Sequence, residues 1–238
     1  MLSALLERPS GNIKAFVLFA HCFTCSKNIG TATRISRALA DRGFATLRFD
    51  FTGLGNSEGD FSNTNFSSNV DDLVAAASYL ANAYEHPRIL VGHSLGGAAV
   101  IAAAARLPEV RAVVTIAAPS DPAHMHHLLR DSVPEIMNKG RATVEIGGQK
   151  FTIRKQFLED VSEQNLEHIL KNLERPLLIM HSPRDKMIGI EHAYHMFDVA
   201  RCSKSFISLD SADHLLNNPG DATYAAETIA AWASRYVR

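Results

Sequence analysis

Short apolar runs and amphipathic segments alternate along most of this chain, and no other feature constrains its fold as strongly. Apolar runs typical of buried strands occupy residues 13–20, 45–51, 88–91, 112–116, 176–180 and 205–209. Segments with helical spacing occupy residues 31–42, 70–84, about 95–106, about 188–200 and about 221–236. Strands that alternate with helices form a parallel sheet covered by helices on both faces. The sequence therefore predicts an α/β fold built on a mostly parallel, twisted sheet.

The alternation stops between residues 118 and 175. Residues 144–153 surround a Gly147-Gly148 pair, which predicts a hairpin, and helical patterns lie on either side of it. We expect a small cap at about residues 119–170, inserted over the carboxyl edge of the sheet. Because 238 residues suit one α/β domain, we expect residues 1–238 to form a single domain with this insertion.

Composition and charge narrow the possible partners. The formal net charge is −1 with scattered Lys and Arg, so no nucleic-acid partner is expected. No apolar segment is long enough to cross a membrane and no signal peptide is recognisable, so no membrane partner is expected. Three cysteines fit a reducing compartment better than a disulfide framework. We expect a cytoplasmic monomer or homodimer.

A G-x-S-x-G pentapeptide, Gly92-His93-Ser94-Leu95-Gly96, follows one predicted strand and precedes a helix rich in small residues. In this strand–turn–helix context the serine hydroxyl is exposed as a nucleophile. Side chains at the two glycines would collide with the adjoining strand or helix. The pattern alone also fits a plain glycine-rich turn, so its interpretation depends on partners elsewhere in the chain. It predicts Ser94 as the nucleophile of an acyl transfer.

A serine hydroxyl becomes nucleophilic when a base takes its proton and a third group orients that base. In this architecture the acid and the histidine follow the serine, each on a loop after a strand. Asp185 follows one predicted strand and His214 follows the next. We predict His214 as the base and Asp185 as the acid, with Asp210 and Asp213 as alternative acids.

The negative oxygen of a tetrahedral intermediate needs preorganised hydrogen-bond donors. One should be the N–H of Leu95, at the N-terminus of the helix after the serine. The other is expected from the loop after the first predicted strand, where we choose Phe23. Cys22 and Cys25 flank Phe23 with C-x-x-C spacing, which also suits a redox pair or half a zinc site. We favour thiols that line the loop, since no second such pair exists.

Taken together, these motifs resemble the serine hydrolases of the α/β-hydrolase superfamily. Residues 19–28 and 48–59 resemble the subgroup often fused to an organic-hydroperoxide-reductase (OsmC-type) domain. The similarity covers nearly the whole chain, and Gly-His-Ser-Leu-Gly-Gly, Ser-Pro-x-Asp and Ala-Asp-His-Leu carry it in combination. The resemblance implies an α/β-hydrolase fold and carboxylic-ester hydrolysis, here by a domain that stands alone.

We therefore predict a serine carboxylic-ester hydrolase that acts on a small-molecule ester with a short to medium acyl group, without cofactor or metal. Apolar cap residues are expected to form a wall for the substrate: Met125, Leu128, Leu129, Ile136 and Met137. A thioesterase or serine peptidase with the same triad stays open, as does a non-catalytic hydrolase-fold binding protein. Other histidines are expected to pack, line the pocket or lie exposed rather than bind metal: His93, His124, His126, His127 and His181.

Overall fold

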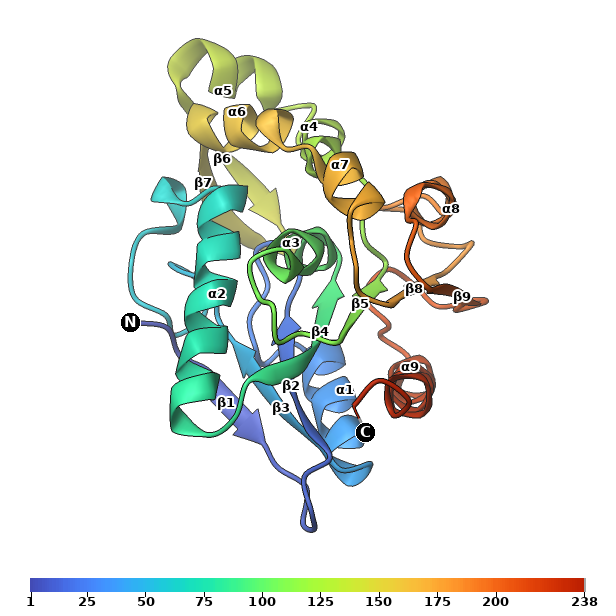
Figure 1. The fold of residues 1–238 in the computed structure, drawn as a ribbon. Helices are drawn as coiled ribbons and strands as arrows, with labels where there is room; N and C mark the ends of the chain where they lie inside the picture. Colours follow the sequence, from blue (N-terminus) through green and yellow to red (C-terminus); the bar gives the residue numbers. More distant parts are fainter. Residues whose placement is uncertain (238) are drawn as a thin grey trace.

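The computed structural model describes residues 1–237, in which the strands form one seven-stranded sheet and a separate hairpin (Figure 1). Arg238, the last residue of the expected domain, lies outside the described residues. The strands of the large sheet are β1 Ala4–Glu7, β2 Ala15–Ala20, β3 Phe44–Phe49, β4 Pro87–His93, β5 Ala112–Ile116, β8 Leu177–His181 and β9 Lys204–Ser208. Their spatial order is β1-β3-β2-β4-β5-β8-β9, and only the β1–β3 pair within these residues is antiparallel. The mostly parallel sheet is confirmed.

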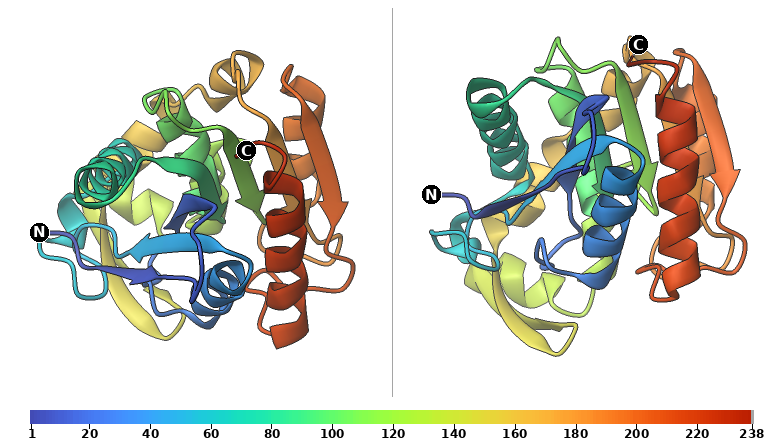
Figure 2. Two further views of the ribbon diagram at one scale, coloured as in Figure 1. Left: turned by 60° about the horizontal axis from the view of Figure 1, so that its bottom comes forward. Right: turned by 90° about the horizontal axis from the view of Figure 1, so that it is seen from below.

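Helices cover both faces of this sheet (Figure 2). The main ones are α1 Gly30–Asp41, α2 Phe66–Ala83, α3 Leu95–Ala104, α8 Glu191–Val199 and α9 Pro219–Ala233. Alternate residues of β2 pack on opposite faces: Leu18 in the core beneath α2 and α3, Val17 and Phe19 in the core beneath α1 and α9. Such strands are buried on both faces, which explains why they form continuous apolar runs. Every helix in the described part of the chain is too short or too polar to span a bilayer.

The observed elements agree with the predicted strands and main helices to within four residues at each end, but β1 was not predicted. Its four residues pair antiparallel with β3, from Ala4 opposite Phe49 to Glu7 opposite Thr46. The segment is short, partly exposed and at the edge of the sheet, so its pattern resembles that of an ordinary chain terminus.

The chain between β5 and β8 forms η2 Pro122–His124, α4 Met125–Leu128, α5 Val133–Lys139, β6 Arg141–Ile146, β7 Gln149–Arg154, α6 Lys155–Glu163 and α7 Leu166–Lys171. Strands β6 and β7 are the predicted hairpin, with Gly147 and Gly148 at its turn. Their φ values of 60° and 77° suit a type I′ turn. Figure 1 shows these elements gathered beyond the carboxyl ends of β4 and β5. A further short helix, η1 Phe61–Asn63, lies between β3 and α2.

Candidate active site

Ser94 lies at the sharp turn where β4 ends and α3 begins. Its φ of 56° and ψ of −128° form a conformation that residues with a side chain rarely adopt. A Cβ on Gly92 would collide with the carbonyl oxygen of Gly96, and a Cβ on Gly96 with that of His21. The two glycines therefore let α3 close against the strand and against residues 21–28, the loop after β2, which we call the β2 loop.

The structure brings Ser94, His214 and Asp185 together from three loops at one edge of the sheet. His214 Nε2 lies 3.0 Å from Ser94 Oγ, and His214 Nδ1 lies 2.7 Å from Asp185 Oδ2. Because an ionised carboxylate only accepts hydrogen bonds, Nδ1 carries the proton and Nε2 accepts from the serine hydroxyl. All three residues are buried. An unprotonated nitrogen on the hydroxyl is the geometry that general-base chemistry requires.

Asp185 is the acid in contact with His214, in preference to Asp210 and Asp213. Its other oxygen accepts hydrogen bonds from two backbone amides of its own loop, at 2.8 and 3.0 Å. Burial by itself would raise the pKa of Asp185, but the hydrogen bond and charge of His214 and these two amides together lower it. Asp213 instead accepts from the main chain and side chain of Asn217, both at 3.0 Å. Asp185 is thus ionised where it meets the imidazole.

Phe23 and Leu95, the residue after the serine, both line one small cavity. Neither N–H donates to an acceptor among residues 1–237. The amide of Leu95 belongs to the first turn of α3, where the helix dipole favours negative charge. Two unpartnered amides, each in a residue that lines the same cavity, can bind an oxyanion.

The β2 loop contains a disulfide between Cys22 and Cys25, which corrects the expectation of two free thiols. The turn brings their Cα atoms to 5.4 Å, within the span of a disulfide, and the Cys25 N–H donates to the Cys22 carbonyl at 3.1 Å. A low cysteine count indicates a reducing compartment and the lack of a disulfide framework. It does not predict whether two cysteines in one tight turn are bonded to each other. Cys202 is a free thiol.

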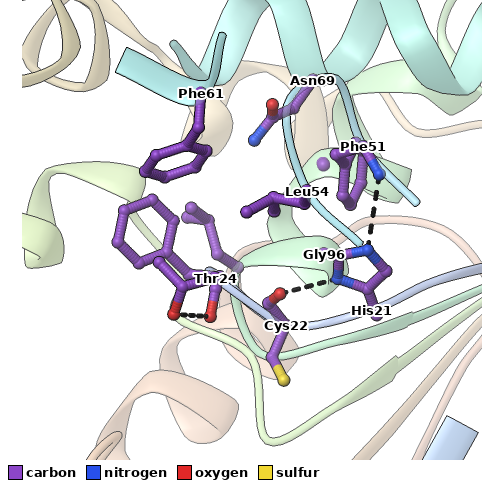
Figure 3. Close-up of a pocket in the computed structure, with 11 residues that line it drawn as sticks. His21, Cys22, Thr24, Phe51, Leu54, Phe61, Asn69 and Gly96 are labelled. Carbon is purple, nitrogen blue, oxygen red and sulfur yellow. Dashed lines mark hydrogen bonds between the residues drawn. The ribbon is translucent and has the colours of Figure 1, made fainter. Parts of the chain in front are cut away.

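Two buried histidines hold the backbone around the site. His21 Nδ1 donates to the carbonyl of Cys22 at 2.8 Å, and its Nε2 accepts from the N–H of Phe51 at 3.4 Å (Figure 3). His93 Nε2 donates to the carbonyl of His214 at 2.7 Å. Burial lowers the pKa of His21 to about 4 and, together with the charge of His214, lowers that of His93 to about 3. His93 was expected only to pack, yet it holds the backbone of the predicted base.

The other predicted histidines have separate partners. His181 Nε2 donates to the carbonyl of Ile188 at 2.9 Å, and burial lowers the pKa of this imidazole. His124 lies 3.2 Å from the carbonyl oxygen of Met187, and His126 Nε2 lies 2.8 Å from Ser162 Oγ. Among residues 1–237 no three His, Cys, Asp or Glu side chains are grouped so that they could hold a metal ion.

Phe23 and Phe61, which line this cavity, belong to a larger group of aromatic side chains. Phe23 packs on Phe61 at 5.6 Å and on Phe157 of α6 at 5.1 Å between ring centroids, and Phe61 packs on Phe151 of β7 at 5.3 Å. We call these four residues the aromatic cluster. The amide of Asn69 is directed into the same cavity (Figure 3). The cavity has a volume of about 10 Å³, room for about one water-sized group.

The apolar wall predicted from the cap is not part of this cavity. Met125, Leu129 and Ile136 are buried in the core, and Met137 is 46% exposed. None of these residues lines the cavity, whose lining comes from the β2 loop, the chain from β3 to α2, and α3. The cap instead reaches the site through Phe151 and Phe157. Helical spacing alone could not distinguish a residue that faces the core from one that faces a substrate.

A buried ion pair braces the other end of the β2 loop. Asp50 accepts from both the backbone N–H and the Nζ of Lys27, each at 2.5 Å, and from the N–H of Asn56 at 2.9 Å. Burial would raise the pKa of Asp50, but these hydrogen bonds lower it. Arg48 donates to the carbonyl of Lys27, and Ser57 Oγ donates to the carbonyl of Asp50 at 2.5 Å. These contacts tie the loop after β3 to the β2 loop.

The sheet, the strained serine turn and the three aligned side chains define an α/β hydrolase. The chain belongs to the family described as "Serine aminopeptidase, S33", whose sequence profile matches residues 11–165.

Similar proteins agree with this class. The crystal structure of the esterase domain from a Rhodothermus marinus protein is 45% identical, with a TM-score of 0.79 over 100% of both chains. Palmitoyl-protein thioesterase ABHD10, mitochondrial, from Mus musculus is 26% identical over 212 residues, which cover 86% of this chain and 70% of that protein. Est1E from Butyrivibrio proteoclasticus, bound to ferulic acid, has a TM-score of 0.80 at 17% identity, over 99% of this chain and 95% of its own, and shows the fold alone.

Proposed function

We propose that this protein is a serine carboxylic-ester hydrolase with Ser94 as nucleophile, His214 as base and Asp185 as acid. The observation that carries the proposal is the continuous hydrogen-bonded line from Asp185 through His214 to the Ser94 hydroxyl. The 45% identical esterase domain supports the same reaction class.

The reaction follows from the protonation states in that line. Ser94 Oγ attacks the ester carbonyl while its proton passes to His214 Nε2, and Asp185 stabilises the imidazolium that forms. The negative oxygen receives hydrogen bonds from the amides of Phe23 and Leu95. Collapse expels the alcohol, which takes its proton from His214. A water molecule, deprotonated by the same nitrogen, then hydrolyses the acyl-enzyme.

The size of the cavity supports a short acyl group. The cavity that Phe23 and Leu95 line has a volume of about 10 Å³, so it favours a small substrate group there. We therefore propose esters with short to medium acyl groups as substrates, with rates that decline as the chain lengthens.

The proposal is tested with p-nitrophenyl acetate and butyrate. Ser94→Ala should lower kcat by at least about 10³-fold, because no other group in the line can form the acyl-enzyme. Ser78→Ala, on the exposed side of α2, is the matched control and should keep the parent rate. Activity should also fall in acid, since His214 must be neutral to take the proton. Equal rates for the parent and Ser94→Ala would favour a non-catalytic binding protein.

A thioesterase is the second candidate, because the curated relatives at about 26% identity carry that activity in their names. The triad does not encode the leaving group. Matched butyryl oxygen esters and butyryl thioesters, followed by palmitoyl thioesters, separate the two. A kcat/KM at least about tenfold higher on thioesters would assign thioester hydrolysis. Hydrolysis of amino-acid p-nitroanilides would assign the peptidase alternative.

We further propose a single hydrolase domain over residues 1–238, with the cap at about 119–170, acting as a monomer or homodimer in the cytoplasm. The contact of Phe157 with Phe23 supports the cap as part of the site. The resemblance to hydrolase domains fused to an OsmC-type domain stays a prediction. Light scattering on the purified protein tests the oligomeric state, and cell fractionation tests the compartment.

A further inference from the structure

The Cys22–Cys25 disulfide encloses the residue whose amide is proposed to bind the oxyanion. Only Phe23 and Thr24 lie between the two cysteines. Thr24 has a φ of 59°, in the left-handed region that a β-branched residue adopts at a cost. Its Oγ1 donates to the carbonyl of Phe23 at 2.7 Å. The disulfide therefore closes a turn that would otherwise relax, and that turn sets the direction of the Phe23 N–H.

The alternative role for this disulfide is to stabilise the fold, and its position in the chain argues against that role. The two cysteines are three residues apart, so the bridge removes little freedom from the unfolded chain. The fold already anchors both ends of the β2 loop, through His21 and through the Lys27–Asp50 ion pair. The effect of the bridge is thus concentrated on the turn itself.

The two sulfurs differ in access. Cys22 is 4% exposed, whereas Cys25 is half-buried, so Cys25 is the more accessible cysteine to a thiolate from solution. In the cytoplasm proposed above, a disulfide is usually transient and has a catalytic or redox-sensing role. Cys202, the third cysteine, is a free thiol elsewhere in the chain.

We propose that Cys22 and Cys25 form a reversible redox site that controls the hydrolase through the amide of Phe23. This inference rests on the proposed function, since it acts on the oxyanion site. A thiolate of a dithiol reductant attacks Cys25 Sγ, the sulfur–sulfur bond breaks, and Cys22 leaves as a thiolate and takes a proton. In the mixed disulfide, Cys25 Sγ is bonded to the first sulfur of the reductant. The second thiol of the reductant then attacks that first sulfur and breaks its bond to Cys25 Sγ. This step releases Cys25 as a thiol and closes a disulfide in the reductant, so two electrons and two protons reach the protein.

Reduction should lower kcat more than it changes KM. Without the bridge Thr24 leaves the left-handed region, the Phe23 N–H turns away, and the amide of Leu95 is left to stabilise the oxyanion. Loss of one such donor lowers kcat by about 10²–10³-fold, and a displaced donor by less, so we expect a fall of about tenfold or more. The ring of Phe23 still packs on Phe61 and Phe157, so substrate binding changes little.

The test compares one preparation in two redox states. The protein is oxidised with glutathione disulfide or reduced with dithiothreitol, freed of reagent by anaerobic gel filtration, and assayed with p-nitrophenyl acetate. Alkylation after denaturation should label one cysteine in the oxidised state and all three in the reduced state. We expect a tenfold or greater fall in kcat on reduction, recovery on reoxidation, and a nearly constant thermal unfolding midpoint.

Variants distinguish a failure of the redox proposal from a failure of the proposed esterase function. Cys22→Ser/Cys25→Ser should be fixed at the low kcat and insensitive to reductant, whereas Cys202→Ser should switch as the parent does. If the Ser94-dependent rate is the same in both redox states, or if three cysteines are alkylated after oxidation, the redox site is wrong and the esterase stands. A fall in the unfolding midpoint with unchanged kcat would assign the bridge to stability and also overturn it. If Ser94→Ala keeps the parent rate, the proposed function itself fails.

Discussion

Ser94 keeps its conformation because the residues around it leave no room for another. A φ of 56° costs a residue with a side chain about 1–3 kcal/mol, and the surrounding contacts must offset that cost. Gly96 makes one of these contacts, since a Cβ there would collide with the carbonyl oxygen of His21 and would lie 2.7 Å from that of Ala20. The serine turn, the end of β2 and the β2 loop are thus packed backbone against backbone.

Gly96→Ala should therefore move the two proposed oxyanion donors, the amides of Phe23 and Leu95, further apart in space. Its methyl group pushes α3 away from the end of β2, so we expect a loss of about 1–3 kcal/mol in the free energy of unfolding. The accompanying displacement of the amides should lower kcat by about tenfold or more. Urea unfolding and ester kinetics measure both. Gly11→Ala, where a Cβ meets nothing within 4 Å, is the control and should leave both unchanged.

Asp185→Asn tests the assignment of the acid. An amide can offer its NH₂ to the imidazole and favour the wrong tautomer, so Nε2 would no longer accept the serine proton. We expect kcat to fall by about 10³–10⁴-fold with a native far-UV spectrum. Asp213→Asn, one residue before His214, should stay within about threefold of the parent. A larger loss in Asp213→Asn than in Asp185→Asn would exchange their roles.

At the scale of elements, the cap and the β2 loop meet, within residues 1–237, through aromatic rings rather than through hydrogen bonds. Phe157, on α6, is 3% exposed and packs on Phe23, which in turn contacts η1 through Phe61. A shift of α6 is therefore transmitted to the backbone that carries one proposed oxyanion donor. We therefore expect the cap to influence the chemistry of the site as well as access to it.

Phe157→Leu should reveal that coupling. The substitution keeps most of the apolar volume, so the free energy of unfolding should fall by less than about 1.5 kcal/mol. The loss of the ring contact with Phe23 should nevertheless lower kcat/KM on p-nitrophenyl acetate by about three- to tenfold. Phe197→Leu on α8, the same change outside the aromatic cluster, should alter only stability. Equal kcat/KM values for both variants would show that the cap does not influence the β2 loop.

At the scale of the whole molecule, the free energy of unfolding depends on pH because neutral histidines are buried between the layers of the fold. The pKa of His21 falls to about 4 and that of His93 to about 3 in the folded protein, from an ordinary value of 6.5. Between these values the unfolded chain binds protons that the folded chain does not, so stability rises with pH and is lost as pH falls. Burial also lowers the pKa of His181 and His192 and adds to this loss.

We expect the free energy of unfolding to fall by roughly 1.4 kcal/mol per pH unit for each of His21 and His93, from about pH 6 down to about pH 4. Urea titrations at pH 7, 6, 5 and 4 measure the slope. His93→Gln can still donate to the carbonyl of His214 but binds no proton, so its slope should be shallower by roughly 1.4 kcal/mol per pH unit. An unchanged slope would mean that His93 is protonated in the fold.

The sequence predicted those features that depend on local pattern and chain order. Strands buried on both faces appear as apolar runs, and Asp185 and His214 were found because each follows a strand. The bridge in the β2 loop, the carbonyl contact of His93 and the aromatic cluster were not predicted. Each of these depends on which loops meet in three dimensions, and the sheet order that decides this, with β2 between β3 and β4, is set by packing.

The place of β9 late in the chain and at the far edge of the sheet has a consequence for the proposed activity during synthesis. Ser94 and both proposed oxyanion donors are translated early, whereas His214 follows β9, the last strand along the described chain. A nascent chain that has not yet reached residue 214 therefore contains the proposed nucleophile without the proposed base. If the proposed triad is correct, the growing chain can bury its central strands and form the serine turn while it has no esterase activity, and hydrolysis begins only after β9 has docked and His214 is in place.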